Sequence, residues 1–247
     1  MNILVTNDDG INCKNMLNLA DRLSINHNVW IVAPQTEQSG CSHSINIRKE
    51  IVFKKVRNHV FACSGSTVDC VLISLLGAID EPIHMVVSGI NPGPNLGTDI
   101  LYSGTAAGAR QGALMGKPSI AFSASSRDPQ ADLSSELEFI ALNLELFGKL
   151  WTPSHFINVN FPLNMNDKTG VEITFPSQRT YNDNLVAKPG TDSSISYLVD
   201  GDEPGAIDES GSDFDAVQRN SISVSPILIR PMMHEDREPY KSARFIF

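Results

Sequence analysis

The sequence predicts an α/β fold with a mostly parallel sheet, followed by a β-rich region. Over the first 125 residues, short apolar runs alternate with segments of helical periodicity. The runs are continuously apolar, which is typical of strands buried on both faces of a parallel sheet. We therefore expect right-handed βαβ crossovers, with helices covering both faces. From residue 171 onward the pattern is strand-like and rich in turns.

The elements of the first half follow from their apolar patterns. Residues 3–5 are a short aliphatic strand that ends in a polar turn at residues 6–10, and Met16, Leu19 and Leu23 then recur at helical spacing. Further strands are expected at 29–33, 85–87 and 118–122, helices at 68–79 and 105–115, and an exposed hairpin at 45–56.

The second half has a different character. One more helix is expected at 137–146, one more strand at 156–160, and three strand-like segments at 171–175, 194–199 and 221–229. Residues 200–215 hold seven acids and no Lys or Arg, which favours a solvated loop, with a metal or partner site as the alternative. The tail at 235–247 ends in an apolar cluster that needs its own domain or a neighbouring subunit to pack on.

The composition excludes several classes of protein. With 247 residues, 41% hydrophobic and 19% charged, the chain is neither collagen-like, nor a coiled coil, nor wholly disordered. A net charge of −9 argues against binding a nucleic acid polymer through the overall field. The four cysteines form no CxxC and no zinc pattern, which favours a reducing compartment. With no signal peptide and no membrane-length apolar run visible, we expect a cytoplasmic protein.

Three polar loops follow directly on apolar strands, at residues 6–10, 34–44 and 88–103. In an open parallel sheet, ligands bind outside the carboxyl ends of the strands, so these loops are expected to meet at one site. Each loop is rich in groups that ligate metals or phosphates. Their convergence is a stronger indication of a site than any single motif.

The first loop carries two adjacent carboxylates, Asp8 and Asp9. Two neighbouring carboxylates repel each other unless a cation lies between them or they point apart. Asp9 could instead cap the helix that begins near Ile11, which explains one acid and not the other. A hard divalent cation with oxygen ligands explains both.

The second loop supplies Ser39 and His43. A Ser-rich turn is usually only a turn, but its position after a buried strand makes Ser39 a candidate uncharged ligand in a site that already holds two carboxylates. His43 could orient a phosphate, donate a proton, or pack against the sheet. The residues alone leave these roles open.

The third loop is the richest in candidate groups. Asn91 directly follows a strand and offers an amide oxygen to a metal, and Asn95 lies four residues further along. Ser103, Gly104 and Thr105 open a helix, where backbone N–H groups, hydroxyls and the helix dipole favour an anion such as phosphate. The alternative is an ordinary N-cap on a tightly packed Gly/Ala helix. There is no GxGxxG after the first strand, no P-loop and no GxSxG elbow.

Four ordered motifs resemble those of the SurE survival-protein family of nucleotidases. They are NDDG at 7–10, VAPxxxQSGxxHS at 32–44, SGINxGxNLG at 88–97 and YSGTAxGA at 102–109. Weaker matches continue in order at 66–71, 158–162 and 212–227, so the resemblance spans nearly the whole chain. Residues 12–16 (NCKNM) depart from the family's Ala-Pro-Gly stretch without removing a candidate ligand.

The resemblance implies the architecture. It implies one domain over residues 1–247: a Rossmann-like three-layer core over about 1–165, then a β-rich extension with a swapped C-terminal segment over about 166–247. It also implies a homodimer or homotetramer with C-terminal exchange. From the charge and the lack of a long apolar run, we expect no nucleic acid polymer and no membrane as a partner.

The resemblance further implies the activity and its residues. The expected activity is metal-dependent hydrolysis of nucleoside 5′- and 3′-monophosphates. One divalent cation per subunit, Mg²⁺ or Mn²⁺, would be held by Asp8, Asp9, Ser39 and Asn91, while Asn95, Ser103, Gly104 and Thr105 would border the phosphate with His43 beside it.

For the mechanism, we expect the cation to neutralise the substrate phosphate and to activate a water as nucleophile. Asp8, Asp9, Ser103 and Thr105 are the expected catalytic residues, with the last two stabilising the phosphoryl oxygens. An alternative makes Asp8 a covalent nucleophile, although a carboxylate committed to a metal is a poorer one. Two other hypotheses remain: a non-catalytic nucleotide- or metal-binding module, and a structural protein whose polar loops are only caps and turns.

Overall fold

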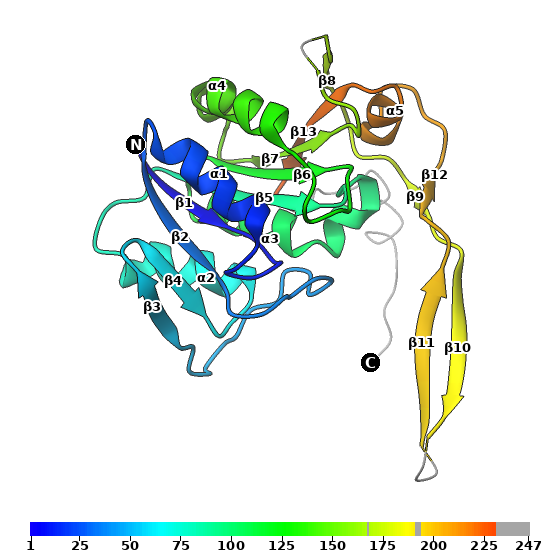
Figure 1. Ribbon diagram of the computed structural model, residues 1–247, viewed down its shortest axis with the longest axis horizontal. Coiled ribbons are helices and arrows are strands. Elements are labelled where there is room, and N and C mark those ends of the chain that lie inside the picture. The colour runs from blue at the N-terminus through cyan, green and yellow to red at the C-terminus, as the bar shows by residue number, and fades with distance from the viewer. Residues whose placement is uncertain (167, 191–193, 231–247) are drawn as a thin grey trace, which may run out of the picture.

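The computed structural model describes residues 1–166, 168–190 and 194–230. Within these residues the main sheet has nine strands in the order β3-β4-β2-β1-β5-β6-β7-β13-β8 (Figure 1). The strands are β1 (Asn2–Thr6), β2 (Asn28–Pro34), β3 (Phe53–Arg57), β4 (Val60–Cys63), β5 (Met85–Pro92), β6 (Ser119–Ala124), β7 (His155–Phe161), β8 (Val171–Ile173) and β13 (Ile222–Leu228).

The sheet is mostly parallel, as the sequence predicts. Strands β4, β2, β1, β5, β6 and β7 form a continuous parallel set. The antiparallel pairs lie toward the two edges, where β3 pairs with β4 and β13 pairs with β7. Continuous apolar strands therefore gave the right fold class, because both faces of the parallel set are covered.

Helices cover both faces of this sheet. On one face α1 (Lys14–Ser24) packs against α4 (Ser134–Leu150), and on the other α2 (Thr67–Ile73) packs against α3 (Gly104–Leu114) (Figure 1). Alternate residues of β1 serve the two layers: Ile3 and Val5 pack in the cluster with α1 and α4, whereas Leu4 packs in the cluster with α2. Each such fully buried side chain contributes about 2 kcal/mol. The result is a three-layer α/β structure.

One expected element lies elsewhere. The hairpin predicted at 45–56 is instead formed by β3 and β4, and residues 45–52 form no strand. Part of this segment satisfies its polar groups on a helix: the Asn46 backbone N–H and side-chain amide donate to the Asp69 carboxylate at 2.9 and 2.6 Å. The prediction was wrong here because the Asp69 carboxylate, and not a neighbouring strand, accepts the hydrogen bonds of Asn46.

A second region projects from this body (Figure 1). Strands β10 (Asp183–Pro189) and β11 (Ile195–Gly201) form an antiparallel hairpin, joined to the body beside the short pair β9 (Arg179–Thr180) and β12 (Gly205–Ala206). The hairpin exposes apolar side chains, among them Leu185, Leu198 and Val199. Strands β8 and β13, which follow residue 165, belong to the main sheet. The predicted division into a core over about 1–165 and an extension over about 166–247 stays a prediction.

The acidic stretch is a solvated loop only in part. Asp200, Asp202, Glu203, Asp208 and Glu209 are exposed, as expected of such a loop. Its end is ordered as α5 (Asp213–Gln218), and Asp213 is fully buried. The Asp213 carboxylate accepts hydrogen bonds from the backbone N–H groups of Gly97 and Ser177 at 2.7 and 2.9 Å. These donors from distant segments offset the cost of burying its charge, which the local composition could not indicate.

The predicted packing of the tail at 235–247 lies outside the described residues. Among the helices that are described, none has the length and apolar character needed to cross a membrane.

Candidate active site

The central strands create a switch point in the sheet. Strand β1 lies between β2 and β5, so the chain winds to one side after β1 and later to the other side after β5. Loops that follow strands on either side of such a point diverge and leave a crevice, which is where open α/β sheets bind ligands. Asp8 and Asp9 follow β1, and Asn91 lies at the carboxyl end of β5.

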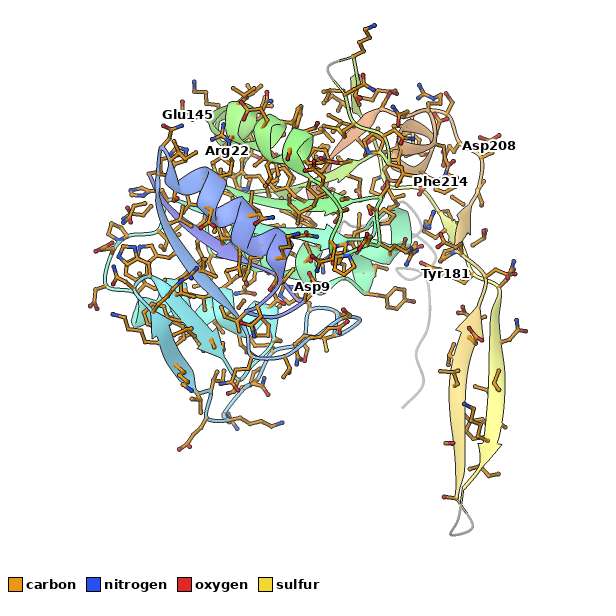
Figure 2. All side chains as sticks on the ribbon, viewed as in Figure 1. Asp9, Arg22, Glu145, Tyr181, Asp208 and Phe214 are labelled. Carbon is orange, nitrogen blue, oxygen red and sulfur yellow. The ribbon has the colours of Figure 1, made fainter. Side chains whose placement is uncertain are left out.

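A cavity of about 350 Å³ lies at these strand ends. It brings together six predicted residues, which are Asp8, Asp9, Ser39, Asn91, Asn95 and Ser103. Its wall also contains residues that were not predicted, namely Glu37, Asp99, Tyr102 and Arg127. Figure 2 labels Asp9 beside the N-terminal end of α1. The three polar loops thus converge as expected.

Asp8 lies at the N-terminus of α3. Only 4% exposed, its carboxylate accepts a hydrogen bond from the Gly104 N–H at 3.1 Å and another from the Thr105 hydroxyl. Burial raises the pKa of Asp8, while these hydrogen bonds act in the opposite direction. The positive end of the helix therefore holds a carboxylate of the protein itself.

The approach of α3 to Asp8 requires glycine. A Cβ at Gly104 would lie 2.7 Å from both Cβ and Oδ2 of Asp8, closer than side-chain atoms pack. Gly104 and Thr105 therefore lie behind Asp8 and are not among the residues that line the cavity. Their predicted contact with phosphate stays a prediction.

Among the described residues, Asp9 has no cationic partner of its own. Burial, then the charge of Asp8 and then that of Glu37 raise the pKa of Asp9 to about 7. In the part of the chain that the structure describes, no Lys, Arg or His forms an ion pair with Asp8 or Asp9. Two adjacent carboxylates that are costly to ionise fit a site for a divalent cation, which would stabilise both charges.

Two uncharged oxygens complete the predicted ligand set. The Ser39 hydroxyl donates to Glu37 Oε1 at 2.8 Å. The amide of Asn91 is oriented by its own Nδ2, which donates to the Gly93 carbonyl at 2.7 Å, and its Oδ1 lies 3.4 Å from the Thr105 hydroxyl. Both carry the oxygen atoms that Mg²⁺ and Mn²⁺ prefer. The described residues contain no group of three or more His, Cys, Asp or Glu suited to a metal, so a cation here would depend on these neutral ligands.

Asn95 is held by hydrogen bonds to residues of two strands, β6 and β7. Its Nδ2 donates to the Ser123 hydroxyl at 2.8 Å, its N–H donates to Asn160 Oδ1 at 2.8 Å, and its carbonyl accepts from Asn158 and Asn160. Ser103 is the N-cap of α3, because its hydroxyl accepts from the Ala106 N–H at 3.0 Å. Both side chains are thus held rigidly in the cavity wall.

His43 lies apart from the other predicted residues. Its Nε2 is 3.0 Å from Gln111 Oε1, and it does not line the cavity. Burial lowers the pKa of His43, which favours the neutral ring at pH 7. Its predicted place beside the phosphate stays a prediction.

Sequence reasoning missed one cation at the cavity. Arg127 follows β6, lines the cavity, and pairs with Glu203 at 3.2 Å. The strand-end rule that found Asn91 applies equally to the loop after β6, so Arg127 was within reach of the same argument. Glu37, beside Ser39, was within reach too. Asp99 and Tyr102 carry no comparable signal.

The fold and the cavity define the class of this protein. It is an α/β protein with a parallel sheet covered on both faces, and an acidic cavity lies at the switch point of that sheet.

Comparisons identify the family within this class. The family model of survival protein SurE matches residues 3–183, and the chain belongs to this family. It is similar to the 5′-nucleotidase SurE of Pseudothermotoga lettingae, with 39% identity over 93% of this chain and 89% of that protein. Its identity to the 5′-nucleotidase SurE of Kosmotoga olearia is 40%, over 92% of each chain. The crystal structure of the SurE protein from Aquifex aeolicus matches with a TM-score of 0.82 and 27% identity, over 97% of this chain and 98% of that one.

Proposed function

We propose that this chain is a 5′-nucleotidase, a divalent-metal-dependent phosphomonoesterase that hydrolyses nucleoside 5′-monophosphates to nucleoside and phosphate. The observation that carries the proposal is the convergence of Asp8, Asp9, Ser39, Asn91 and Ser103 on one cavity at the switch point. The relatives named 5′-nucleotidase SurE support the same activity.

The residues at the site fit a divalent cation. Asp8, Asp9, Ser39 and Asn91 would hold it, since they offer two carboxylates, a hydroxyl and an amide oxygen. A divalent cation in such a site neutralises phosphate charge and lowers the pKa of a coordinated water toward neutrality. We propose one Mg²⁺ or Mn²⁺ per subunit.

Residues of this chain would orient the Asp8 carboxylate and stabilise the phosphoryl oxygens. Gly104 and Thr105 hold the Asp8 carboxylate at both oxygens, which keeps it oriented and makes it a poor covalent nucleophile. The geometry therefore favours attack by water over an aspartyl phosphate. Ser103 lines the cavity and would stabilise the phosphoryl oxygens, and Arg127 brings a positive charge to the same wall.

The finer parts of the proposal concern substrate range, assembly and location. We propose that 3′-monophosphates are also substrates. A homodimer or homotetramer is supported by the apolar side chains that the hairpin β10–β11 exposes, and the C-terminal segment is proposed to exchange between subunits. A cytoplasmic location is supported by four free cysteines, which a reducing compartment preserves.

Phosphate release from a panel of nucleoside monophosphates tests the activity. We expect the wild-type protein to release phosphate with Mg²⁺ or Mn²⁺, to stop when a chelator is added, and to be nearly inactive as Asp8→Asn. Release that survives both chelator and substitution would contradict the metal-dependent site. No release from any nucleotide, with metal still bound, would favour a binding module instead.

A further inference from the structure

A second cavity adjoins the proposed catalytic one. Its volume is about 590 Å³, and Pro94 and Arg127 belong to the walls of both cavities. Its wall combines apolar side chains, an aromatic ring and amides, including Leu96, Leu163, Phe214, Val217, Gln218 and Asn220. A ligand whose phosphate lies at Asp8 and Asp9 could therefore extend past Arg127 into this space.

The aromatic ring in this wall is held by a buried cation. The Arg179 guanidinium lies 5.0 Å from the centre of the Phe214 ring, within the range of a cation–π contact. The Arg179 side chain is only 4% exposed, and its Nη1 has no hydrogen-bond partner among the described residues. A buried guanidinium with an unused donor is costly unless a ligand or water completes it.

The same arginine connects the two cavities. Arg179 donates from Nε to Asp99 Oδ2 at 2.9 Å and from Nη2 to the Pro204 carbonyl at 2.9 Å. Asp99 lines the catalytic cavity and also accepts a hydrogen bond from the Tyr181 hydroxyl at 2.6 Å. Figure 2 labels Phe214 near α5 and Tyr181 near the base of the hairpin. Arg179 and Phe214, which lie in the extension after residue 166, thus form part of the wall of the second cavity. The hydrogen bond from Arg179 to Asp99 links this wall to the wall of the catalytic cavity.

We propose that this second cavity binds the nucleoside part of the substrate, with the base against Phe214 and the amides of Gln218 and Asn220 near its polar edge. The proposal rests on the proposed function. Bases stack on aromatic side chains whatever their identity, and amide side chains both donate and accept hydrogen bonds. The site would therefore accept several bases and distinguish nucleotides from phosphate esters that lack a base.

Two other cavities fit a nucleoside less well. A cavity of about 470 Å³ also borders the site, but its described lining, which includes Asp9, Lys14, Glu37 and Arg127, holds no aromatic residue. A cavity of about 670 Å³ shares no described lining residue with the catalytic one. Of these three cavities, the one at Phe214 combines a wall shared with the catalytic cavity and an aromatic ring in its described lining.

The test compares substrates with and without a base. Gln218 is exposed, so Gln218→Ala removes an amide without disturbing the core, and Phe214→Leu keeps apolar volume while removing the ring face. We expect kcat/KM for AMP and UMP to fall about tenfold in Phe214→Leu and severalfold in Gln218→Ala, mainly through KM. For ribose 5-phosphate, kcat/KM should stay within about twofold of the wild-type value.

Two matched variants control for position. Gln130→Ala removes an amide from the rival 470 Å³ cavity, and Phe53→Leu alters a half-buried ring on the edge strand β3. Both should leave the ratio of AMP to ribose 5-phosphate activity unchanged. Equal losses on both substrates in Phe214→Leu and Gln218→Ala, no loss in either, or a base-specific loss in Gln130→Ala instead would overturn the proposal.

Direct binding separates this inference from the proposed activity. Isothermal titration calorimetry should show weaker AMP binding in Phe214→Leu and Gln218→Ala, with binding of inorganic phosphate unchanged. If the wild type binds AMP with this pattern but hydrolyses no nucleotide, the proposed activity fails and the nucleoside site stands. If AMP and inorganic phosphate respond alike, the nucleoside site fails whatever the activity.

Discussion

The strand ends that carry Asp8 and Asn91 differ from the hairpin β10–β11 in how their side chains are satisfied. At the strand ends, Asp8 and Asn91 have hydrogen-bond partners within the same chain. Along the hairpin, Leu185, Leu198 and Val199 are exposed, although the strands pair with each other over their full length. A two-stranded hairpin is marginally stable by itself, so its apolar face gains from further contacts. The comparison teaches that side chains at the strand ends find hydrogen-bond partners within this chain, whereas the hairpin leaves apolar side chains exposed, which is the observation behind the proposed assembly.

The largest expected effect breaks the site and leaves the fold intact. Asp8→Asn should lower kcat/KM for AMP by about a thousandfold, because it removes a charged ligand. The free energy of unfolding without metal should change by less than about 1 kcal/mol, because the substitution removes a charge that burial disfavours and Thr105 can accept from the new amide. Phosphate-release kinetics and urea unfolding measure the two quantities. Parallel losses of activity and stability would contradict a role in function.

The second effect tests how closely α3 must approach Asp8. The Cβ of Gly104→Ala would lie 2.7 Å from Cβ and Oδ2 of Asp8, so the carboxylate must move. A displacement of about 1 Å costs about a hundredfold in rate. Gly170→Ala is the matched control, since its nearest contact would be Ser221 Oγ at 3.8 Å. Steady-state kinetics of both variants suffice. Equal activities would show that the contact with Gly104 is not needed.

The third prediction concerns Arg127, which lines the catalytic cavity and pairs with Glu203 of the second region. Arg127→Ala should raise KM for AMP about five- to tenfold, with kcat changed less than about twofold, because this exposed cation would mainly attract the phosphate. Arg22→Ala, which breaks the exposed pair with Glu138 at 2.7 Å, is the control and should change neither parameter. The difference between wild type and Arg127→Ala should shrink as salt is raised. A loss confined to kcat would assign Arg127 a different role.

The smallest effect on catalysis is expected in the hairpin. Leu185 and Val199 are directly opposed in the register, so Leu185→Ser with Val199→Ser removes an exposed apolar pair. Analytical ultracentrifugation should show a smaller assembly, while kcat/KM per subunit stays within about twofold. An unchanged assembly would remove the support that this face gives to oligomerisation. A large loss of activity would mean that the hairpin contributes to the site.

The two regions were also unequally predictable. Asp8, Asp9 and Asn91 could be placed from the sequence because each follows a continuous apolar strand, and parallel strands bring their carboxyl ends to one edge. Strand β4 was missed because it has only four residues after a short turn. The pairing of β10 with β11 was missed because Asp183, Asn184 and Lys188 obscure the alternation of its first strand.

Residues whose role depends on distant partners were the hardest to predict. Asp213 sits in an acidic stretch typical of a solvated loop, and the N–H groups of the distant Gly97 and Ser177, together with that of the adjacent Phe214, satisfy its buried carboxylate. Arg179 had no local signal either, because its partners Asp99, Pro204 and Phe214 come from three separate segments. The local pattern predicts strand ends well, and it does not predict how the extension folds back on them.

Binding of Mn²⁺ tests the central claim most directly. Calorimetric titration of the metal-free protein should give one site per subunit in the wild type, no site in Asp8→Asn, and one site in the control Asp200→Asn, whose carboxylate is exposed on the hairpin. This result would show that the paired carboxylates at the switch point hold a cation. Equal binding by wild type and Asp8→Asn would contradict the account, because the convergence of Asp8, Asp9, Ser39 and Asn91 would then serve the fold alone.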